Sequence, residues 1–274
     1  MKSDLASRIP VAILYVLGIL VMLWLGQVTA IILIFFFAVM CLFEFIQVSD
    51  PNRIRGRDRS MAISLPVIFI LLALTLPIHD YFWYVLLTIS ILYFIVNAIY
   101  LLTQSRILYI GNPLWINAML YLGIPFSLLI WRLGIDYNFP LFLLAVFVMI
   151  WLNDTGAYFF GKAFGKNKLH PKISPGKTVE GLVGGGICIL GVGYLIHTVT
   201  GLNSLAVWML IAFAIFLFSV VGDLSESAWK RYYQIKDSST VLKGHGGFLD
   251  RLDSFIYAAP IAILCSLILS TINN

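Results

Sequence analysis

Long apolar runs occupy most of the chain, and polar residues are confined to short segments between them. A helix of about 20 apolar residues crosses the ~30 Å hydrocarbon layer of a bilayer, and it satisfies its own backbone hydrogen bonds there. The pattern predicts an all-α, polytopic integral membrane protein whose single domain, 1–274, holds about nine transmembrane helices. The predicted spans lie at about 9–26, 28–48, 61–78, 81–102, 114–131, 140–160, 182–199, 204–224 and 254–271.

The first two predicted spans are separated only near Gly26 and Gln27. We expect a tight helical hairpin there, with a long re-entrant pair as the alternative. No small-residue cleavage site follows the first apolar run, so a transmembrane helix is favoured over a cleavable signal peptide.

Composition agrees with a membrane protein. The chain is 61% hydrophobic and 11% charged, whereas soluble domains hold about 25% charged residues. The three cysteines, Cys41, Cys188 and Cys265, lie far apart inside apolar runs without CxxC spacing. We expect them to be packing residues.

The basic residues predict the orientation of the spans. With a cytoplasmic N-terminus and an outside C-terminus, every lysine and arginine except Arg132 falls in an inside segment, as the positive-inside rule requires. We expect a multi-pass protein of the cell (inner) membrane with its active site facing the cytoplasm. The arginine-rich segment 51–60 is either part of this anchor or a site for anionic lipid headgroups.

Two of the predicted cytoplasmic segments are long, 161–181 and 225–253, and they hold the main polar constellations. Both follow residue 150, so we divide the chain into N-terminal spans, 1–150, and a catalytic group of spans, 151–274.

The first polar constellation begins at Asp154, near the end of a span. An acid inside a membrane is costly and is a functional candidate by default, with a packing role as the alternative. The five lysines that follow suit a polyphosphate, although topology alone also places lysines here. Ser174 and Lys177 lie in SPGKT, which resembles a Walker loop but has Pro171 where that motif needs glycine, and no strand is expected before it.

Glycines follow directly. Gly181 and Gly185 have the GxxxG spacing that lets two helices approach closely. Close helix packing is expected, with a glycine surface against a ligand as the alternative.

The second constellation, 222–253, brings acids and bases onto common helix faces. On a helix, Asp223, Glu226, Ser227, Lys230 and Arg231 share one face. Asp250 and Asp253 share a face at the start of the last span, after the glycine turn GHGG. Carboxylates at two helix ends offer the hard oxygen ligands that Mg²⁺ takes together with water and phosphate. The alternative is a salt-bridged loop in which Asp250, Arg251 and Asp253 pair internally.

These residues resemble a known family. The stretch S-A-W-K-R-x4-K-D-x-S-x2-L-K-G-H-G-G-F-x-D-R-L-D, 227–253, resembles the signature of phosphatidate cytidylyltransferases, the CDP-diacylglycerol synthases. NDTGAY and GKAFGKNKL…ISPGKTVEG upstream resemble that family's other shared region, so the match covers about 150–255. Lys243 departs from the proline or glycine that is more usual there.

The resemblance implies that CTP and phosphatidic acid react to give CDP-diacylglycerol and pyrophosphate, with Mg²⁺ required and a second cation possible. We hypothesise that Asp223 and Asp250 bind metal, with Asp253 as a further ligand. The remaining candidates, which would contact phosphates or substrate, are Lys177, Lys230, Arg231, Ser174, Ser227, His245, Asp154, Lys236 and Asp237. Membrane lipids are further expected partners, a nucleic acid is not, and a homodimer is left open.

Two other functions remain. A CTP-dependent lipid-alcohol kinase would need a base near the hydroxyl, and Asp154 could serve. A transporter would place its polar residues at mid-membrane, whereas here the acids gather at span ends. A CDP-alcohol phosphotransferase is disfavoured because its closely spaced aspartate motif is not present.

Overall fold

In the described residues, eight helical segments are long and apolar enough to cross a membrane, and Pro10–Trp24 is a shorter apolar helix. One of the eight, Leu114–Ile135, consists of α5, the π-helix and α6 in sequence. The computed structural model describes residues 2–50, 56–75, 80–108, 112–242 and 246–273. The prediction of an all-α polytopic membrane protein is confirmed. The helices are α1 Lys2–Trp24, α2 Gln27–Ser49, α3 Gly56–Thr75, α4 Asp80–Gln104, α5 Leu114–Ala118, a π-helix Met119–Gly123, α6 Ile124–Ile135, α7 Phe139–Phe164, α8 Val179–Thr200, α9 Leu205–Tyr232 and α10 Leu249–Asn273.

The segments expected as loops at 161–181 and 225–253 are partly regular structure. Helix α7 runs on to Phe164, and α9 runs on to Tyr232. Between α7 and α8, β1 Lys168–His170 and β2 Ser174–Thr178 form an antiparallel hairpin. The polar ends of these helices project beyond their apolar runs, so hydropathy alone ends them too early.

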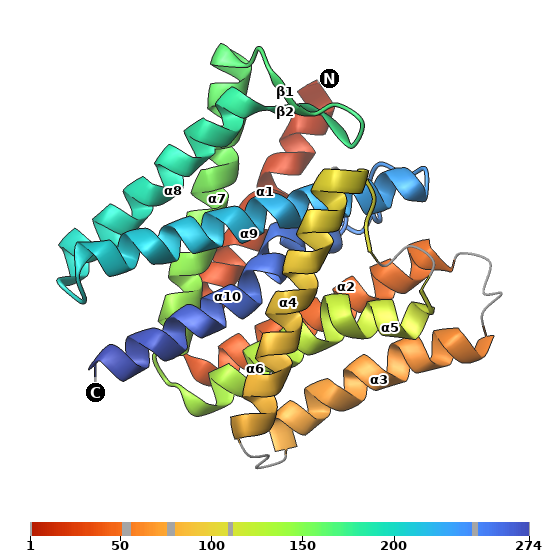
Figure 1. Cartoon of the computed structure of the whole chain (residues 1–274), viewed down its shortest axis with the longest axis horizontal. Helices are drawn as coiled ribbons and strands as arrows, with labels where there is room; N and C mark the ends of the chain where they lie inside the picture. The colour runs from red at the N-terminus through yellow and green to blue at the C-terminus, as the bar shows by residue number, and fades with distance from the viewer. Residues whose placement is uncertain (1, 51–55, 76–79, 109–111, 243–245, 274) are drawn as a thin grey trace.

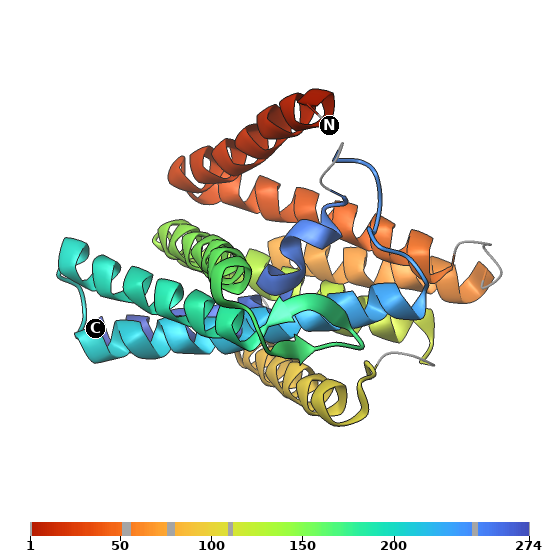
Figure 2. The same cartoon turned by 90° about the horizontal axis from the view of Figure 1, so that it is seen from above.

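Helices α1 and α2 are separate helices joined by a tight turn. Gly26 between them has φ 111°, a conformation that favours glycine. The two helices diverge from this turn as a V, with α1 set apart from the rest of the bundle (Figure 2). The expected hairpin is therefore present.

Glycines set the closest helix contacts. A Cβ on Gly185 would lie 2.6 Å from Asn153 Oδ1, and a Cβ on Gly181 would lie 2.7 Å from the Ala157 carbonyl oxygen of α7. The packing role predicted for this GxxxG pair is confirmed, since no larger residue fits between α7 and α8.

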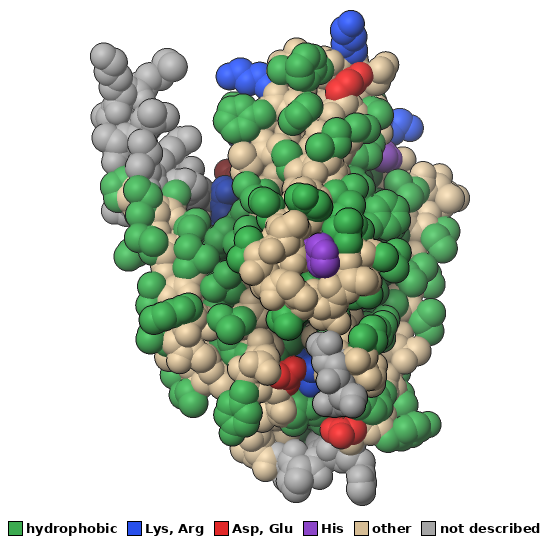
Figure 3. All heavy atoms as spheres, turned by 90° about the vertical axis from the view of Figure 1, so that its left-hand side faces the viewer, with side chains coloured by type: hydrophobic (Ala, Val, Ile, Leu, Met, Phe, Trp, Pro, Cys, Tyr) green, Lys and Arg blue, Asp and Glu red, His purple; other side chains and the backbone are tan. Residues whose placement is uncertain are grey.

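Charged side chains lie mainly toward the ends of the bundle, and apolar ones lie between them (Figure 3). The chain termini lie at opposite ends of the molecule (Figure 1). Arg132, at the end of α6, is buried, pairs with Asp136 and donates to Ser266 Oγ at 3.0 Å. On the side shown in Figure 3, apolar side chains cover most of the surface and charged ones lie mainly toward the two ends. This distribution suits helices that face lipid.

The N-terminal and C-terminal helices are not separate units. Residue 150 lies inside α7, and Asn97 of α4 donates to Ser225 Oγ of α9 at 3.3 Å and to the Tyr257 hydroxyl of α10. The cysteines are free thiols; Cys41 and Cys265 are buried and Cys188 is half-buried.

Candidate active site

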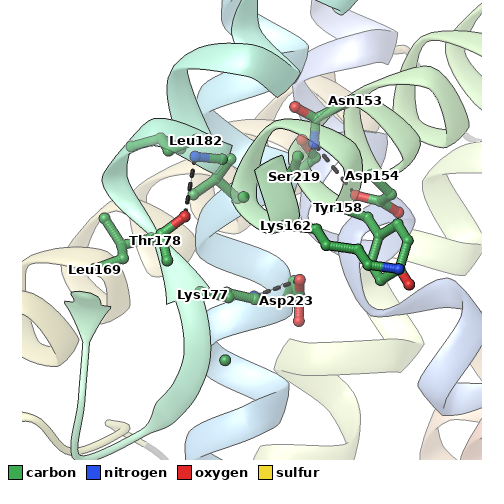
Figure 4. A pocket seen from close by; sticks show the side chains of 15 residues that line it. Asn153, Asp154, Tyr158, Lys162, Leu169, Lys177, Thr178, Leu182, Ser219 and Asp223 are labelled. Carbon is green, nitrogen blue, oxygen red and sulfur yellow. Dashed lines mark hydrogen bonds and ion pairs between the residues drawn. The ribbon is translucent and has the colours of Figure 1, made fainter. Parts of the chain in front are cut away.

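Two neighbouring cavities lie among α1, α7, α8, α9, α10 and the hairpin. The larger, of about 480 Å³, is bounded by α7, the hairpin, α8 and α9 (Figure 4). The smaller, of about 200 Å³, is bounded by α1, α7, α10 and the segment before α10. Asp154 lines both cavities, so it stands where they adjoin.

The hairpin delivers a lysine to the larger cavity. Strand pairing aligns Lys168 with Thr178, and Thr178 Oγ1 caps α8 by accepting from Gly181 N at 3.1 Å. Lys177, in β2 directly before the capping residue, points toward α9 and forms an ion pair with Asp223 (Figure 4). SPGKT is therefore strand β2 itself and not a loop that wraps a phosphate.

Lysine and aromatic side chains of α7 complete this wall. Lys162 Nζ lies 5.8 Å from the Tyr158 ring centroid, a cation–π distance. Both residues line the larger cavity together with Lys177 and Thr178. The cavity thus presents two ammonium groups and a ring face.

Carboxylates from three helices line the two cavities: Asp154 lines both, Asp223 the larger and Asp253 the smaller. Asp253 experiences the charges of Asp223 and Asp154, and Asp154 experiences those of Asp223, Lys177 and Arg251. Gly222 makes this approach possible, because a Cβ there would lie 2.6 Å from the Asp253 carbonyl oxygen. Repulsion among partly desolvated carboxylates is unfavourable unless a cation joins them.

Asp250 is held firmly at the start of α10. Its Oδ1 pairs with Lys230 Nζ at 2.8 Å, and its Oδ2 accepts from Ser238 N at 2.8 Å and Gly247 N at 2.7 Å. Lys230 also pairs with Glu226 at 2.5 Å. Lys230 thus links one carboxylate of α9 to one of α10.

Glu44 of α2 is a site residue that the sequence analysis missed. It is fully buried and accepts from Phe248 N at 3.0 Å, Leu249 N at 2.9 Å, Ser238 Oγ at 2.9 Å and Ser239 Oγ at 2.7 Å. A carboxylate at a helix N-terminus satisfies free N–H groups and complements the helix dipole. The signal in the sequence was a lone acid within an apolar run.

Two glycines precede α10, and each is required there: Gly246 by its backbone conformation and Gly247 by its closeness to Glu44. Gly246 has φ 81°, and a Cβ on Gly247 would lie 2.2 Å from both Glu44 Oε2 and Ser238 Oγ. His245 and Lys243 lie outside the described residues, so their predicted roles stay predictions.

The other predicted site residues lie away from the two cavities. Arg231 donates from Nε to the Ile173 carbonyl oxygen at 3.3 Å and so ties the hairpin to α9. Among the described residues, neither cavity is lined by Ser174, Ser227, Arg231, Lys236 or Asp237. Ser174 and Ser227 are half-buried, while Lys236 and Asp237 are exposed.

The donors near the cavities suit a hard cation. In the described part of the chain, no three Asp, Glu, His or Cys side chains already form a metal-binding group. Mg²⁺ needs only one or two protein carboxylates because water and phosphate fill its other positions. Asp223, Asp250 and Asp253, the expected ligands, line the cavities and offer such oxygens, so the residues present fit the expected ion.

Comparison with known proteins places this architecture in a family. A family model described as the cytidylyltransferase family matches residues 6–269. The chain is 35% identical over 258 residues to a phosphatidate cytidylyltransferase of Staphylococcus haemolyticus. The aligned region covers 91% of this chain and 94% of that protein. The corresponding values are 41% over 170 residues for the Staphylococcus saprophyticus protein of that name, covering 61% and 64%, and 37% over 196 residues for the Staphylococcus aureus protein, covering 70% and 74%.

The resemblance noted in the C-terminal half thus extends across nearly the whole chain. The chain belongs to the cytidylyltransferase family.

Proposed function

We propose that this protein is a phosphatidate cytidylyltransferase, which transfers CMP from CTP to phosphatidic acid. A phosphate oxygen of the lipid bonds to the α-phosphorus of CTP, and the bond to the leaving pyrophosphate breaks. The observation that carries the proposal is a pair of cavities that share Asp154 and are lined by Asp223, Asp253 and Lys177.

The chemistry calls for charge neutralisation more than for a base. The attacking phosphate oxygen is already anionic, so the barrier comes from bringing two polyanions together. Positioning and preorganised positive charge lower such a barrier. Lys177 and Lys162, which line the larger cavity, would contact the triphosphate of CTP there. A cavity of about 480 Å³ lies in the size range of small-ligand pockets, about 300–1,000 Å³.

We assign Mg²⁺ to the carboxylates of α9 and α10: Asp223, Asp250 and Asp253. When bound, the ion supplies positive charge to the attacking and leaving phosphate oxygens. Asp250 Oδ1 now contacts Lys230, which keeps Glu226 as a second anionic partner. Asp250 can therefore exchange this contact without leaving Lys230 unpaired. A second cation and a homodimer are further expectations of this proposal.

In our proposal the protein lies in the inner membrane, and its site faces the cytoplasm. CTP is water-soluble and phosphatidic acid lies in the bilayer, so the reaction needs the interface between them. The distribution of basic residues supports this orientation.

One assay tests the function. Purified protein is supplied with phosphatidic acid and CTP labelled separately in the cytidine and the γ-phosphate, with Mg²⁺ or with a chelator. We expect cytidine label in the lipid only with Mg²⁺. Transfer of the γ-phosphate would instead identify a lipid kinase, and uptake without a lipid product would identify a transporter.

The first substitution to test is Asp223→Asn. Removing the carboxylate that pairs with Lys177 should lower kcat by about 100-fold or more, because its charge acts in the transition state. Asp80→Asn, at an exposed acid at the start of α4, is the matched control and should keep wild-type activity. Near-normal turnover of Asp223→Asn would exclude the metal role.

A further inference from the structure

The smaller cavity combines an apolar wall with a charged end. Helix α1 contributes Val11, Ala12, Tyr15 and Val16, and Trp151 and Leu242 extend the wall. The charged end consists of Asp154, Asp250, Arg251 and Asp253. This division matches a molecule with a hydrocarbon part and a phosphate head, whose charge Arg251 and a cation held by the carboxylates would offset. The α1 wall has no role in the site described so far.

The exposure pattern of α1 shows which side of it faces the cavity. Val11, Ala12, Tyr15 and Val16 are half-buried, whereas Leu14 and Leu17, on the other side, are 75% and 52% exposed. Helix α1 contacts α2 and α7 and otherwise stands apart from the bundle (Figure 2). A hydrocarbon chain leaving the cavity along α1 would therefore pass directly into the surrounding lipid.

Tyr15 adds a polar group to the apolar wall. Its hydroxyl is buried and has no hydrogen-bond partner among the described residues. The hydroxyl experiences the charges of Arg251 and Asp253, and the ring packs against Phe37 and Phe248 at 6.2 and 6.5 Å between centroids. Buried polar groups rarely lack a partner, so an oxygen of a bound molecule is the natural one.

We propose that the smaller cavity binds the lipid substrate as a membrane phosphomonoester. Its phosphate contacts Arg251 and the Tyr15 hydroxyl, and its acyl chains follow the inner side of α1 between α1 and α7. The phosphate then lies beside Asp154, the residue shared with the larger cavity. The inference rests on the proposed function for the identity of the lipid, since it divides that function's two substrates between two adjoining cavities.

A matched pair of tryptophan substitutions tests the site. Val16→Trp fills the cavity, while Leu17→Trp places the same side chain one residue further on, on the exposed side of α1. We expect Val16→Trp to raise the KM for phosphatidic acid about tenfold and to leave the KM for CTP within about twofold, with Leu17→Trp unchanged. Equal effects of the two tryptophans, or equal changes in both KM values, would overturn the assignment.

Tyr15→Phe is a second test that keeps the aromatic ring and removes only the hydroxyl, so a loss of folding does not confuse the result. We expect roughly a fivefold rise in the KM for phosphatidic acid at an unchanged melting temperature. An unchanged KM for phosphatidic acid would remove Tyr15 from the site.

A binding measurement separates this inference from the proposed function. Each variant is purified in detergent, and retention of labelled phosphatidic acid and of CTP is measured, with inorganic phosphate and glycerol phosphate as competitors. We expect Val16→Trp to lose the lipid but keep CTP, and neither competitor to displace the lipid at equal concentration. If the wild type retains the lipid without making product, the proposed function fails and the lipid site stands. If Val16→Trp retains the lipid as the wild type does, or free phosphate displaces it, the lipid site fails.

Discussion

At the scale of single residues, the sequence identified the acids of the signature but not the residue that holds them. Asp223, Asp250 and Asp253 were found because they lie within one polar segment of recognisable pattern. Glu44 was missed because its partners, Ser238, Phe248 and Leu249, lie 194 to 205 positions away in sequence. A local pattern carries no information about such a contact.

Glu44→Gln tests the importance of this anchor. The amide can accept with only one oxygen, so some of the four donors around it lose their acceptor, which costs about 1–3 kcal/mol for each buried group left unpaired. We expect a lower melting temperature and, because Ser238 also holds Asp250, a kcat reduced by about tenfold. Asp58→Asn is the control, since that carboxylate accepts from Leu114 N away from the site. Equal losses in both variants would show a general folding effect.

At the scale of helices and strands, the apolar runs predicted each membrane span to within several residues, because bilayer thickness sets helix length. The short hairpin was not predicted, and the predicted spans ended before the polar ends of α7 and α9, although a helical face was expected at 223–231. Hydropathy cannot distinguish a polar helix end from a loop, and a strand of three residues such as Lys168–His170 has too little pattern to detect. These unpredicted pieces carry Lys177 and Lys230, so the errors fell on the site.

Gly222 controls the distance between two of the helices that bear carboxylates. A Cβ there would lie 3.0 Å from Tyr257 Cβ as well as 2.6 Å from the Asp253 carbonyl oxygen. Gly222→Val should therefore push α9 away from α10 and separate Asp223 from Asp253. We expect kcat to fall about 100-fold or more, as measured by CMP transfer. Gly191→Val, at a glycine of α8 with open space around it, should have little effect, and similar losses in the two variants would contradict this role.

At the scale of the whole molecule, the number of helices could be predicted, but their neighbours could not. Nothing in the sequence places α1 against α7 and beside Asp154, or α2 beneath the start of α10. Those contacts join segments more than 100 residues apart. They bring carboxylates of α7, α9 and α10, Asp154, Asp223 and Asp253, to two adjoining cavities.

This clustering makes a prediction about the stability of the fold. Mg²⁺ bound only by the folded state stabilises it by about 2.7 kcal/mol at 100 times Kd, which in a chain of this size raises Tm by roughly 5–10 °C. Without the ion, burial and the neighbouring charges of Asp223 and Asp154 disfavour the charged Asp253 carboxylate, so Asp253→Asn should melt higher than the wild type in a chelator.

In Mg²⁺ the Tm advantage of Asp253→Asn over the wild type should shrink to zero or change sign. The variant has lost the repulsion but also a ligand for the ion. Thermal unfolding in detergent measures all four combinations, with Asp80→Asn as the control that keeps the wild-type response. A wild-type Tm that is the same with Mg²⁺ and with chelator would show that the carboxylates hold no such ion. An unchanged Mg²⁺ increment in Asp253→Asn would remove that residue from the ligand set and leave Asp223 and Asp250 to supply the protein oxygens.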